Sequence, residues 1–284
     1  MKENIQKQFG NIDIPHKYKY VILPVPFEQT TTYQKGCEKG PEALINASEQ
    51  LELYDIETDS EPYLEGIFTA PPVFASNSKE MIDKVYESVT SYLHQDKFVI
   101  TLGGEHSISF PSILAYLEHY HQLTVLQFDA HADLYPHYED NPFSHASVMA
   151  RVKDKGIPIV RIGLRSLGKE ELPLLQKKDT FFGNDPFDID KLLLKLKGPI
   201  YITFDVDALD PSIMPSTGTP EPGGLAWNTT LKILKEVILH RNVVGFDIVE
   251  LRPLKDNGAP DFLAAKLLYK MVGYENARAF GKKL

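Results

Sequence analysis

The chain of 284 residues contains a single cysteine, Cys37. One cysteine cannot form a disulfide within the chain, and a chain without disulfides fits a reducing compartment, so we expect a cytoplasmic protein. Cys37 lies between Gly36 and Glu38 with no evident histidine partner, and a thiol needs an activating neighbour to become a nucleophile. We therefore do not expect cysteine-dependent catalysis.

Long apolar runs and an excess of positive charge are also missing. No stretch approaches the roughly 18 apolar residues that a membrane-spanning helix needs. The first 19 residues are polar and mixed in charge, without the apolar region of a secretory signal. The chain has 30 Lys and Arg against 39 Asp and Glu, a formal net charge of −9. This balance argues against nucleic acid or an anionic membrane as a partner, because few phosphates could be neutralised.

Several familiar catalytic and binding motifs are absent as well. The chain has no Walker A loop, no G-x-S-x-G elbow and no H-E-x-x-H motif. An EF-hand starting at Asp129 fails, because Leu134 stands where glycine is required. His119 and His121 lie in a polar segment and are interpreted as a solvated helix end rather than metal ligands.

Short apolar segments alternate with longer segments of helical periodicity. Several of the short segments are apolar on both faces, as strands buried within a parallel sheet are. The predicted strands are Tyr20–Leu23, Phe98–Leu102, Thr124–Phe128, Ile157–Ile162, Ile200–Phe204 and Val243–Val249. Apolar stripes predict helices within Lys79–His94, Thr229–His240 and Ala259–Val272, and in the last of these Phe262, Ala265 and Leu268 should face the core. The alternation predicts one α/β domain over residues 1–284, with a mostly parallel central sheet and helices on both faces.

Carboxylates and histidines gather where three of these strands end. The strand Thr124–Phe128 runs into Asp129, His131 and Asp133, spaced two residues apart and therefore on one side of an extended chain. Asp205 and Asp207 follow Ile200–Phe204 in the same spacing, and His106 follows Phe98–Leu102 after two glycines. In open α/β sheets, ligands bind beyond the carboxyl ends of the strands.

Convergence of these six side chains would require cations. Two like charges about 4 Å apart repel by roughly 4 kcal/mol at an effective dielectric near 20, so four aspartates need cations or protons nearby. Mixed imidazole and carboxylate ligands suit manganese, with nickel, iron, cobalt or zinc as alternatives. The number of ligands suits two metal ions, which could hold and deprotonate a bridging water. A single one of these aspartates could equally cap the helix that follows it.

Six segments of the chain together resemble the ureohydrolase (arginase/agmatinase) family, and agmatinases more closely than arginases. They are GGEHS at 103–107, FDAHADL at 128–134, FSHAS at 143–147, TFDVDALDP at 203–211, TGTPEPGGL at 217–225 and DIVEL at 247–251. The resemblance spans residues 20–275 in order. It implies the arginase-like three-layer sandwich and a trimeric or hexameric homo-oligomer.

The resemblance also implies which residues hold metal. One manganese ion would be bound by His106, Asp129, Asp133 and Asp205, and the other by Asp129, His131, Asp205 and Asp207. Glu105 stands where arginases usually carry Asp, and it is not a ligand in the family.

The implied reaction is hydrolysis of a guanidino compound to an amine and urea, by attack of a metal-bridging hydroxide. Asp133 would hold the hydroxide and pass its proton to the leaving amine. Glu250 would pair with the guanidinium, and His145 would shuttle protons to solvent. Without the resemblance, Glu250 would be interpreted as an exposed strand-end carboxylate and His145 as the start of a helix.

The sequence favours agmatine as substrate, giving putrescine and urea. The Ser-Gly-Asn-type loop with which arginases bind the amino-acid end of arginine is absent, and Asp140–His145 (DNPFSH) resembles the agmatinase form. Glu28, Tyr135 and Asn141 are candidates to contact the amine tail. Ser216 and Arg252 depart from the family pattern near the expected substrate end.

Two other functions stay open at this stage. The same metal pair could hydrolyse guanidinobutyrate, guanidine, arginine or formimidoylglutamate, with Arg165 or Arg252 meeting an acidic tail. The chain could also be a catalytically silent metal-binding subunit, although its ligand set is complete.

Overall fold

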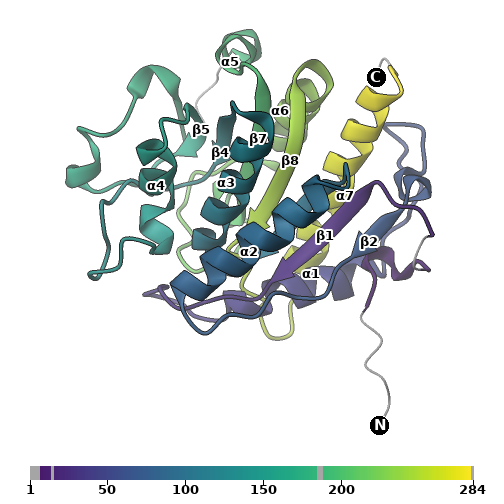
Figure 1. Ribbon diagram of the computed structural model, residues 1–284, viewed down its shortest axis with the longest axis horizontal. Helices are drawn as coiled ribbons and strands as arrows, with labels where there is room; N and C mark the ends of the chain where they lie inside the picture. Colours follow the sequence, from purple (N-terminus) through teal and green to yellow (C-terminus); the bar gives the residue numbers. More distant parts are fainter. Residues whose placement is uncertain (1–6, 14–15, 184–187, 283–284) are drawn as a thin grey trace.

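A computed structural model describes residues 7–13, 16–183 and 188–282. At its centre lies an eight-stranded sheet with the order β2-β1-β3-β8-β7-β4-β5-β6, in which every neighbouring pair is parallel (Figure 1). The strands are β1 (Tyr20–Val25), β2 (Ile67–Thr69), β3 (Phe98–Gly103), β4 (Thr124–Phe128), β5 (Ile159–Leu164), β6 (Thr180–Phe182), β7 (Pro199–Asp205) and β8 (Asn242–Val249).

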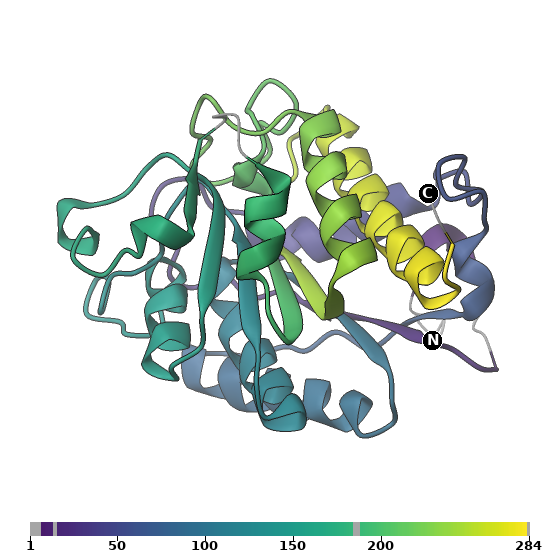
Figure 2. The ribbon, with the colours of Figure 1, turned by 90° about the horizontal axis from the view of Figure 1, so that it is seen from above.

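Within the described ranges, seven α-helices cover the two faces of the sheet. They are α1 (Gly40–Ser48), α2 (Ser78–Leu93), α3 (Ser109–Tyr120), α4 (Val148–Asp154), α5 (Ile189–Lys195), α6 (Trp227–His240) and α7 (Ala259–Ala279). Helices α1, α5, α6 and α7 pack against one face, and α2, α3 and α4 against the other. Figure 2 shows the green and yellow helices α6 and α7 on the opposite side of the sheet from the blue helices α2 and α3. The predicted three-layer α/β architecture is confirmed.

The predicted strands all occur, with ends shifted by up to two residues. Strand β5 is shifted by two residues at both ends, and β1 ends at Val25 rather than Leu23. Two further strands, β2 and β6, were not predicted. Each has only three residues and lies at an edge of the sheet, so neither carries enough residues to show a periodic pattern.

The predicted helices occur too, but the packing of α7 differs from the prediction. Ala265 and Leu268 are buried in the core, whereas Phe262 keeps 41% of its surface exposed. Phe262 lies in the first turn of α7 on the side that faces solvent, whereas Pro260 of the same turn is buried. His119 and His121 are exposed at the end of α3, as predicted.

One glycine sets the distance between α3 and the sheet. Tyr116 of α3 is fully buried, and its hydroxyl donates to the carbonyl of Val99 over 2.9 Å. A Cβ at Gly245 of β8 would collide with this hydroxyl. The absent side chain therefore leaves room for the Tyr116 hydroxyl between β3 and β8.

A buried ion pair fastens the loop before β2 to the last helix. Lys270 of α7 is 5% exposed, and its Nζ lies 3.0 Å from Asp55 Oδ2 and 2.5 Å from Glu57 Oε2. Burial tends to raise the pKa of Asp55, but hydrogen bonding from Thr58 and Lys270 holds it below its usual value. The pKa of Glu57 is lowered in the same way by Lys270 against the effect of burial.

The strand order places the carboxyl ends of β3, β8, β7 and β4 side by side in the middle of the sheet. The chain leaves β3 on one side of this group and re-enters at β4 on the other, so the strand order switches here. Such a switch point opens a crevice at the carboxyl edge, where α/β proteins bind ligands. None of the helices in the described ranges is long and apolar enough to span a membrane.

Candidate metal centre

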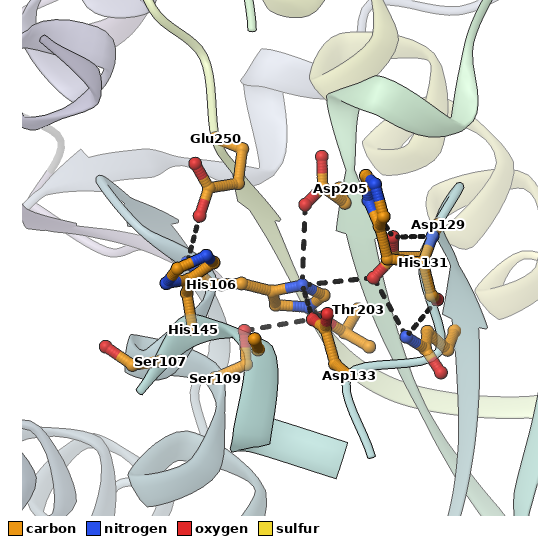
Figure 3. A network of polar contacts seen from close by, with 12 residues as sticks. His106, Ser107, Ser109, Asp129, His131, Asp133, His145, Thr203, Asp205 and Glu250 are labelled. Carbon is orange, nitrogen blue, oxygen red and sulfur yellow. Dashed lines mark hydrogen bonds and ion pairs between the residues drawn. The ribbon is translucent and has the colours of Figure 1, made fainter. Parts of the chain in front are cut away.

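Each of the four central strands delivers acidic or imidazole side chains to the same place. His106 begins the short helix η4 (His106–Ile108) just after β3, and Asp205 ends β7. Asp129, His131 and Asp133 follow β4, and Glu250 follows β8. Figure 3 shows His106 at the centre of this cluster, with Glu250 and His145 on one side and Asp129 and His131 on the other.

The first of two potential metal sites is built around His106, which is 1% exposed. Its Nδ1 lies 3.0 Å from Asp133 Oδ2, 3.2 Å from Asp129 Oδ2 and 3.4 Å from Asp205 Oδ2. Ligand atoms of His106, Asp129 and Asp205 all lie within 4.8 Å of one another. This group can hold one cation, and Asp133 is close enough to join it.

The second potential site shares Asp129 with the first. Its other members are His131 and Asp207, and the three ligand atoms again lie within 4.8 Å of one another. His131 Nδ1 lies 2.9 Å from Asp207 Oδ2 and 3.6 Å from Asp129 Oδ1. Because Asp129 belongs to both groups, the cluster is able to hold a pair of metal ions.

Backbone amides donate hydrogen bonds to one oxygen of each of the carboxylates of Asp129, Asp205 and Asp207. The amide of His131 donates to Asp129 Oδ1 (2.6 Å), that of Ala130 to Asp207 Oδ1 (2.9 Å) and that of Asp207 to Asp205 Oδ1 (2.8 Å). Each carboxylate thus has one oxygen held by the main chain. Its other oxygen is directed by this contact towards the centre of the cluster.

A hydrogen-bonded chain lies behind His106. The Nε2 of His106 is 2.8 Å from Thr203 Oγ1, and the hydroxyl of Thr203 donates to Asp247 Oδ1 over 2.8 Å. Since the Thr203 proton is used on the carboxylate, its oxygen accepts from Nε2–H, and Nδ1 is the imidazole atom with a free lone pair. That Nδ1 is buried and lacks a hydrogen-bond partner. A buried, unpartnered nitrogen facing carboxylates fits a bound divalent cation.

The electrostatics of the cluster point the same way. Burial alone would lower the pKa of His131, but the charge of Asp207 and hydrogen bonding to Asp129 raise it to about 12. Burial and the charge of Asp129 raise the pKa of Asp133 to about 7, and burial and Asp207 raise the pKa of Asp205. Without metal, His131 holds its proton and the carboxyl groups of Asp133 and Asp205 resist ionisation. Divalent cations can replace these protons as the positive charge that the buried carboxylates need.

Asp133 and Glu250 both have strained backbones. Their φ angles are 53° and 64°, in the left-handed region that costs a non-glycine residue roughly 1 kcal/mol or more. The amide of His106 donates to Glu250 Oε1 over 2.6 Å, and the amide of Glu250 donates to the carbonyl of Gly104 over 2.8 Å. Burial raises the pKa of Glu250 to about 8. Glu250 is 7% exposed rather than a solvated strand-end carboxylate.

His145 begins the short helix η5 (His145–Ser147) and reaches the cluster from a loop. Burial, together with the positive charges of His106 and His131, lowers the pKa of His145 to about 4. Its Nδ1 and its amide lie 3.1 and 3.0 Å from the hydroxyl oxygen of Thr30. Its ring packs edge-on against Tyr138, with ring centroids 5.9 Å apart.

Glu105 and Glu28 hold loops in place instead of binding metal. Glu105 is fully buried and accepts hydrogen bonds from the amides of Gln29 and Thr30, both over 2.6 Å. Burial raises the pKa of Glu105 against these hydrogen bonds. Glu28 accepts from the Thr31 hydroxyl and the Gly36 amide, so it shapes its own loop.

A cleft of about 230 Å³ opens above the cluster. Its floor includes His106, His131, Asp133, Asp205, Asp207 and Glu250, and its walls include Thr31, Tyr33, Tyr135, Tyr138, His145, Gly168 and Glu171. Among the described residues that line it, none is lysine or arginine. The cleft is therefore acidic and aromatic.

Both arginines considered for an acidic tail are engaged elsewhere. The guanidinium of Arg165 donates to main-chain carbonyls, including those of Asp207 (2.7 Å) and Glu221 (2.6 Å). Arg252 donates to the carbonyl of Lys35 over 2.9 Å. Of the candidates for the amine tail, Tyr135 lines the cleft, whereas Asn141 contacts Ser78. Cys37 is buried, and burial raises the pKa of its thiol.

The structure thus brings all eight predicted site residues together at one edge of the sheet. Sequence reasoning missed Thr203 and Asp247 behind His106, and Thr30 beside His145. Asp247 carried a detectable signal, because it is a carboxylate in the middle of an apolar strand. Thr30 carried no such signal, because its loop is far from His145 in the sequence and the two meet only in the folded chain.

Comparison with known proteins gives consistent matches over almost the whole length. The model of the arginase family matches residues 18–273. An N(1)-aminopropylagmatine ureohydrolase of Thermus thermophilus is 36% identical over 95% of both chains. An agmatinase of Bacillus cereus is 35% identical over 87% of this chain and 88% of that protein. The crystal structure of the agmatine ureohydrolase of Thermoplasma volcanium superposes with a TM-score of 0.86, at 30% identity over 97% of this chain and 96% of that one.

Proposed function

Because the chain belongs to the arginase family of ureohydrolases, we propose that it hydrolyses a small guanidino compound with a cationic tail, foremost agmatine, to putrescine and urea. The observation that carries this proposal is the cleft above the metal cluster, whose described lining residues include no lysine or arginine. A substrate with a carboxylate tail would meet several carboxylates and no lysine or arginine among these residues, and like charges brought together cost several kcal/mol.

The metal pair is proposed to be manganese, with nickel or another divalent ion as the alternative. Imidazole and carboxylate ligands from His106, Asp129, His131, Asp205 and Asp207 suit such ions. Two cations held by these residues would lower the pKa of a bound water, so that it could attack the guanidinium carbon at neutral pH.

The chain's own groups then orient the substrate and move protons. Glu250 pairs with the guanidinium, and this cation offsets the burial that raises the pKa of its carboxyl. Asp133 accepts a hydrogen bond from the attacking water and passes a proton to the leaving amine. His145 exchanges protons between the cleft and solvent, and its lowered pKa keeps the imidazole unprotonated, and so able to accept a proton, at neutral pH.

Tyr135 and Tyr138 are proposed to receive the tail. Both line the cleft, their rings meet at 61° with centroids 5.6 Å apart, and Tyr138 also packs on His145. An ammonium over an aromatic face gains about 0.5–2 kcal/mol, more as water is excluded. Buried Glu171 adds a negative charge to the same wall.

N(1)-aminopropylagmatine is the second candidate substrate. The Thermus thermophilus relative bears that name, and a longer tail with a further amine suits the same wall. Tyr33 is 74% exposed at the cleft, so the walls continue to the surface, where a longer tail would emerge.

The test is urea release from a panel of guanidino compounds by the manganese-loaded protein. We expect kcat/KM for agmatine to exceed that for arginine, guanidinobutyrate or formimidoylglutamate by about 100-fold or more. A higher value for N(1)-aminopropylagmatine than for agmatine would transfer the assignment to the longer substrate. Equal rates on all compounds would defeat the cationic-tail proposal, and no urea from any of them would favour a catalytically silent subunit.

We also propose a cytoplasmic homo-oligomer, a trimer or hexamer, with no nucleic-acid or membrane partner. The single cysteine supports the compartment, and the net charge of −9 supports the absence of polyanionic partners. Size-exclusion chromatography with light scattering tests the oligomer, and cell fractionation tests the compartment.

A further inference from the structure

Three residues from separate segments form a continuous chain behind the cleft. The hydroxyl of Thr30 donates to Oε1 of Glu105 over 2.9 Å. The same hydroxyl oxygen lies 3.0 Å from the amide nitrogen of His145 and 3.1 Å from its Nδ1. Glu105 is fully buried, and His145 lines the cleft.

The protons in this chain can be assigned by counting donors and acceptors. Oε1 of Glu105 accepts from Thr30 and from the hydroxyl of Ser107 (2.6 Å), while Oε2 accepts the amides of Gln29 and Thr30. Each oxygen of the Glu105 carboxylate thus accepts two hydrogen bonds, and the Thr30 hydroxyl donates its only proton to this carboxylate. Two lone pairs remain on Thr30 Oγ1. One lone pair accepts the hydrogen bond from the amide of His145. The other faces Nδ1 of His145 and can only accept a hydrogen bond, so Nδ1 must carry a proton.

We propose that Thr30 and Glu105 are positioning residues that hold His145 in its Nδ1–H tautomer and leave Nε2 as a proton acceptor. The inference rests on the proposed function, because it explains how His145 can accept a proton during the proposed reaction. The ring can neither turn over nor exchange its tautomer without losing the Thr30 contact. Glu105 acts only through Thr30, and Thr30 only through His145.

Ser144 offers the competing arrangement and hence the matched control. Its Oγ lies 3.3 Å from Nδ1 of His145 and accepts the amide of Ala146 over 3.3 Å. A proton donated from Ser144 would make Nδ1 an acceptor and give the opposite tautomer. The shorter contact is to Thr30, so removal of the Ser144 hydroxyl should leave the tautomer unchanged.

The direct test is ¹⁵N NMR of histidine-labelled protein at pH 8, well above the ordinary imidazole pKa near 6.5. The protein is loaded with diamagnetic Zn²⁺, and the signals of His145 are identified by their loss in His145→Gln. We expect the Nδ1–H pattern in the parent, Thr30→Ser and Ser144→Ala proteins. Thr30→Val should shift His145 to Nε2–H or to a mixture. An Nε2–H pattern in the parent, or an unchanged pattern in Thr30→Val, overturns the proposal.

Kinetics provide the second arm. Thr30→Val should lower kcat for urea release by about 10- to 100-fold with KM changed less than about 3-fold, since a wrong tautomer impairs proton transfer more than binding. Thr30→Ser, which restores the hydroxyl, should recover kcat. A matching loss in both variants would indicate a structural role for Thr30 and contradict the proposal. The NMR arm still reads the tautomer if the protein releases no urea, so failure of the proposed function is distinguished from failure of this inference.

Discussion

The Nε2 of His106 lies 2.8 Å from the hydroxyl oxygen of Thr203, which donates in turn to Asp247. Thr203 on β7 and Asp247 on β8 are paired directly across the sheet, so the register of two central strands sets the orientation of the imidazole. Tyr201 completes the arrangement by donating to the other oxygen of Asp247 over 2.9 Å.

Thr203→Val should weaken binding of divalent metal about 10- to 100-fold, because the isosteric side chain removes the acceptor that fixes the His106 tautomer. Thr203→Ser keeps the hydroxyl and should bind within about 3-fold of the parent. Isothermal titration of the metal-free protein with Mn²⁺ measures both. Equal affinity in the parent and Thr203→Val would show that the hydroxyl does not orient His106.

Asp133→Asn should reduce urea release by at least about 100-fold while much of the metal stays bound. His106, Asp129 and Asp205 still offer three ligands without Asp133, but the amide cannot carry a proton to the leaving amine. Metal content by elemental analysis and turnover are measured on the same sample. Near-normal turnover would remove Asp133 from the proton-transfer role.

Gly168→Ala should impair recognition of the substrate tail. A Cβ at Gly168 would collide with the hydroxyl of Tyr135, and the tyrosine ring can yield by rotating into the cleft. We expect KM for agmatine to rise about 3- to 30-fold with a smaller effect on kcat, because only tail contacts change. Gly258→Ala is the control, since its Cβ would meet nothing within 4 Å. An unchanged KM would place the tail elsewhere in the cleft.

Lys270→Met should destabilise the protein by about 3–5 kcal/mol at pH 7, because Asp55 is left buried without its cation. Lys270 holds the pKa of Asp55 and Glu57 below their usual values, so its contribution is present above the ordinary pKa of a carboxyl group. That contribution is lost as the pH falls through the lowered values, and the difference between variant and parent should shrink at pH 3.

Denaturant unfolding of the metal-free proteins at both pH values measures this difference. Lys79→Met is the control, since the Lys79–Asp83 pair is exposed and should contribute less than about 1 kcal/mol. A Lys270→Met effect of the same size at pH 7 and pH 3 would contradict the ion-pair explanation.

The sequence predicted best those features that depend on a pattern within one short segment. Buried parallel strands are apolar on both faces, and a run such as Thr124–Phe128 matches the structure at both ends. Asp129, His131 and Asp133 follow this strand directly, so their convergence with Asp205 needed only the parallel sheet. Strand β2 has only three residues and is stabilised by pairing with β1, so its own sequence shows no pattern that predicts a strand.

The contacts that tune the site were harder to predict, because they cross between segments. Thr203 and Asp247 meet through strand register, and Thr30 reaches His145 across 115 positions of sequence. No spacing rule connects such pairs before the fold is known. The prediction for Phe262 failed for a different reason: its spacing is helical, but spacing alone does not fix which side of the first turn of α7 faces the core.

The contact between Glu250 and the amide of His106 joins the residue proposed to hold the substrate to the backbone of a metal ligand. Displacing Glu250 would disturb His106, and displacing His106 would disturb Glu250. Substitutions at these two strand ends are therefore poorly tolerated. The walls of the cleft come instead from loops such as those bearing Tyr33, Tyr135 and Gly168. Descendants of this chain could therefore acquire new substrates by exchanging loop residues while inheriting the reacting centre intact.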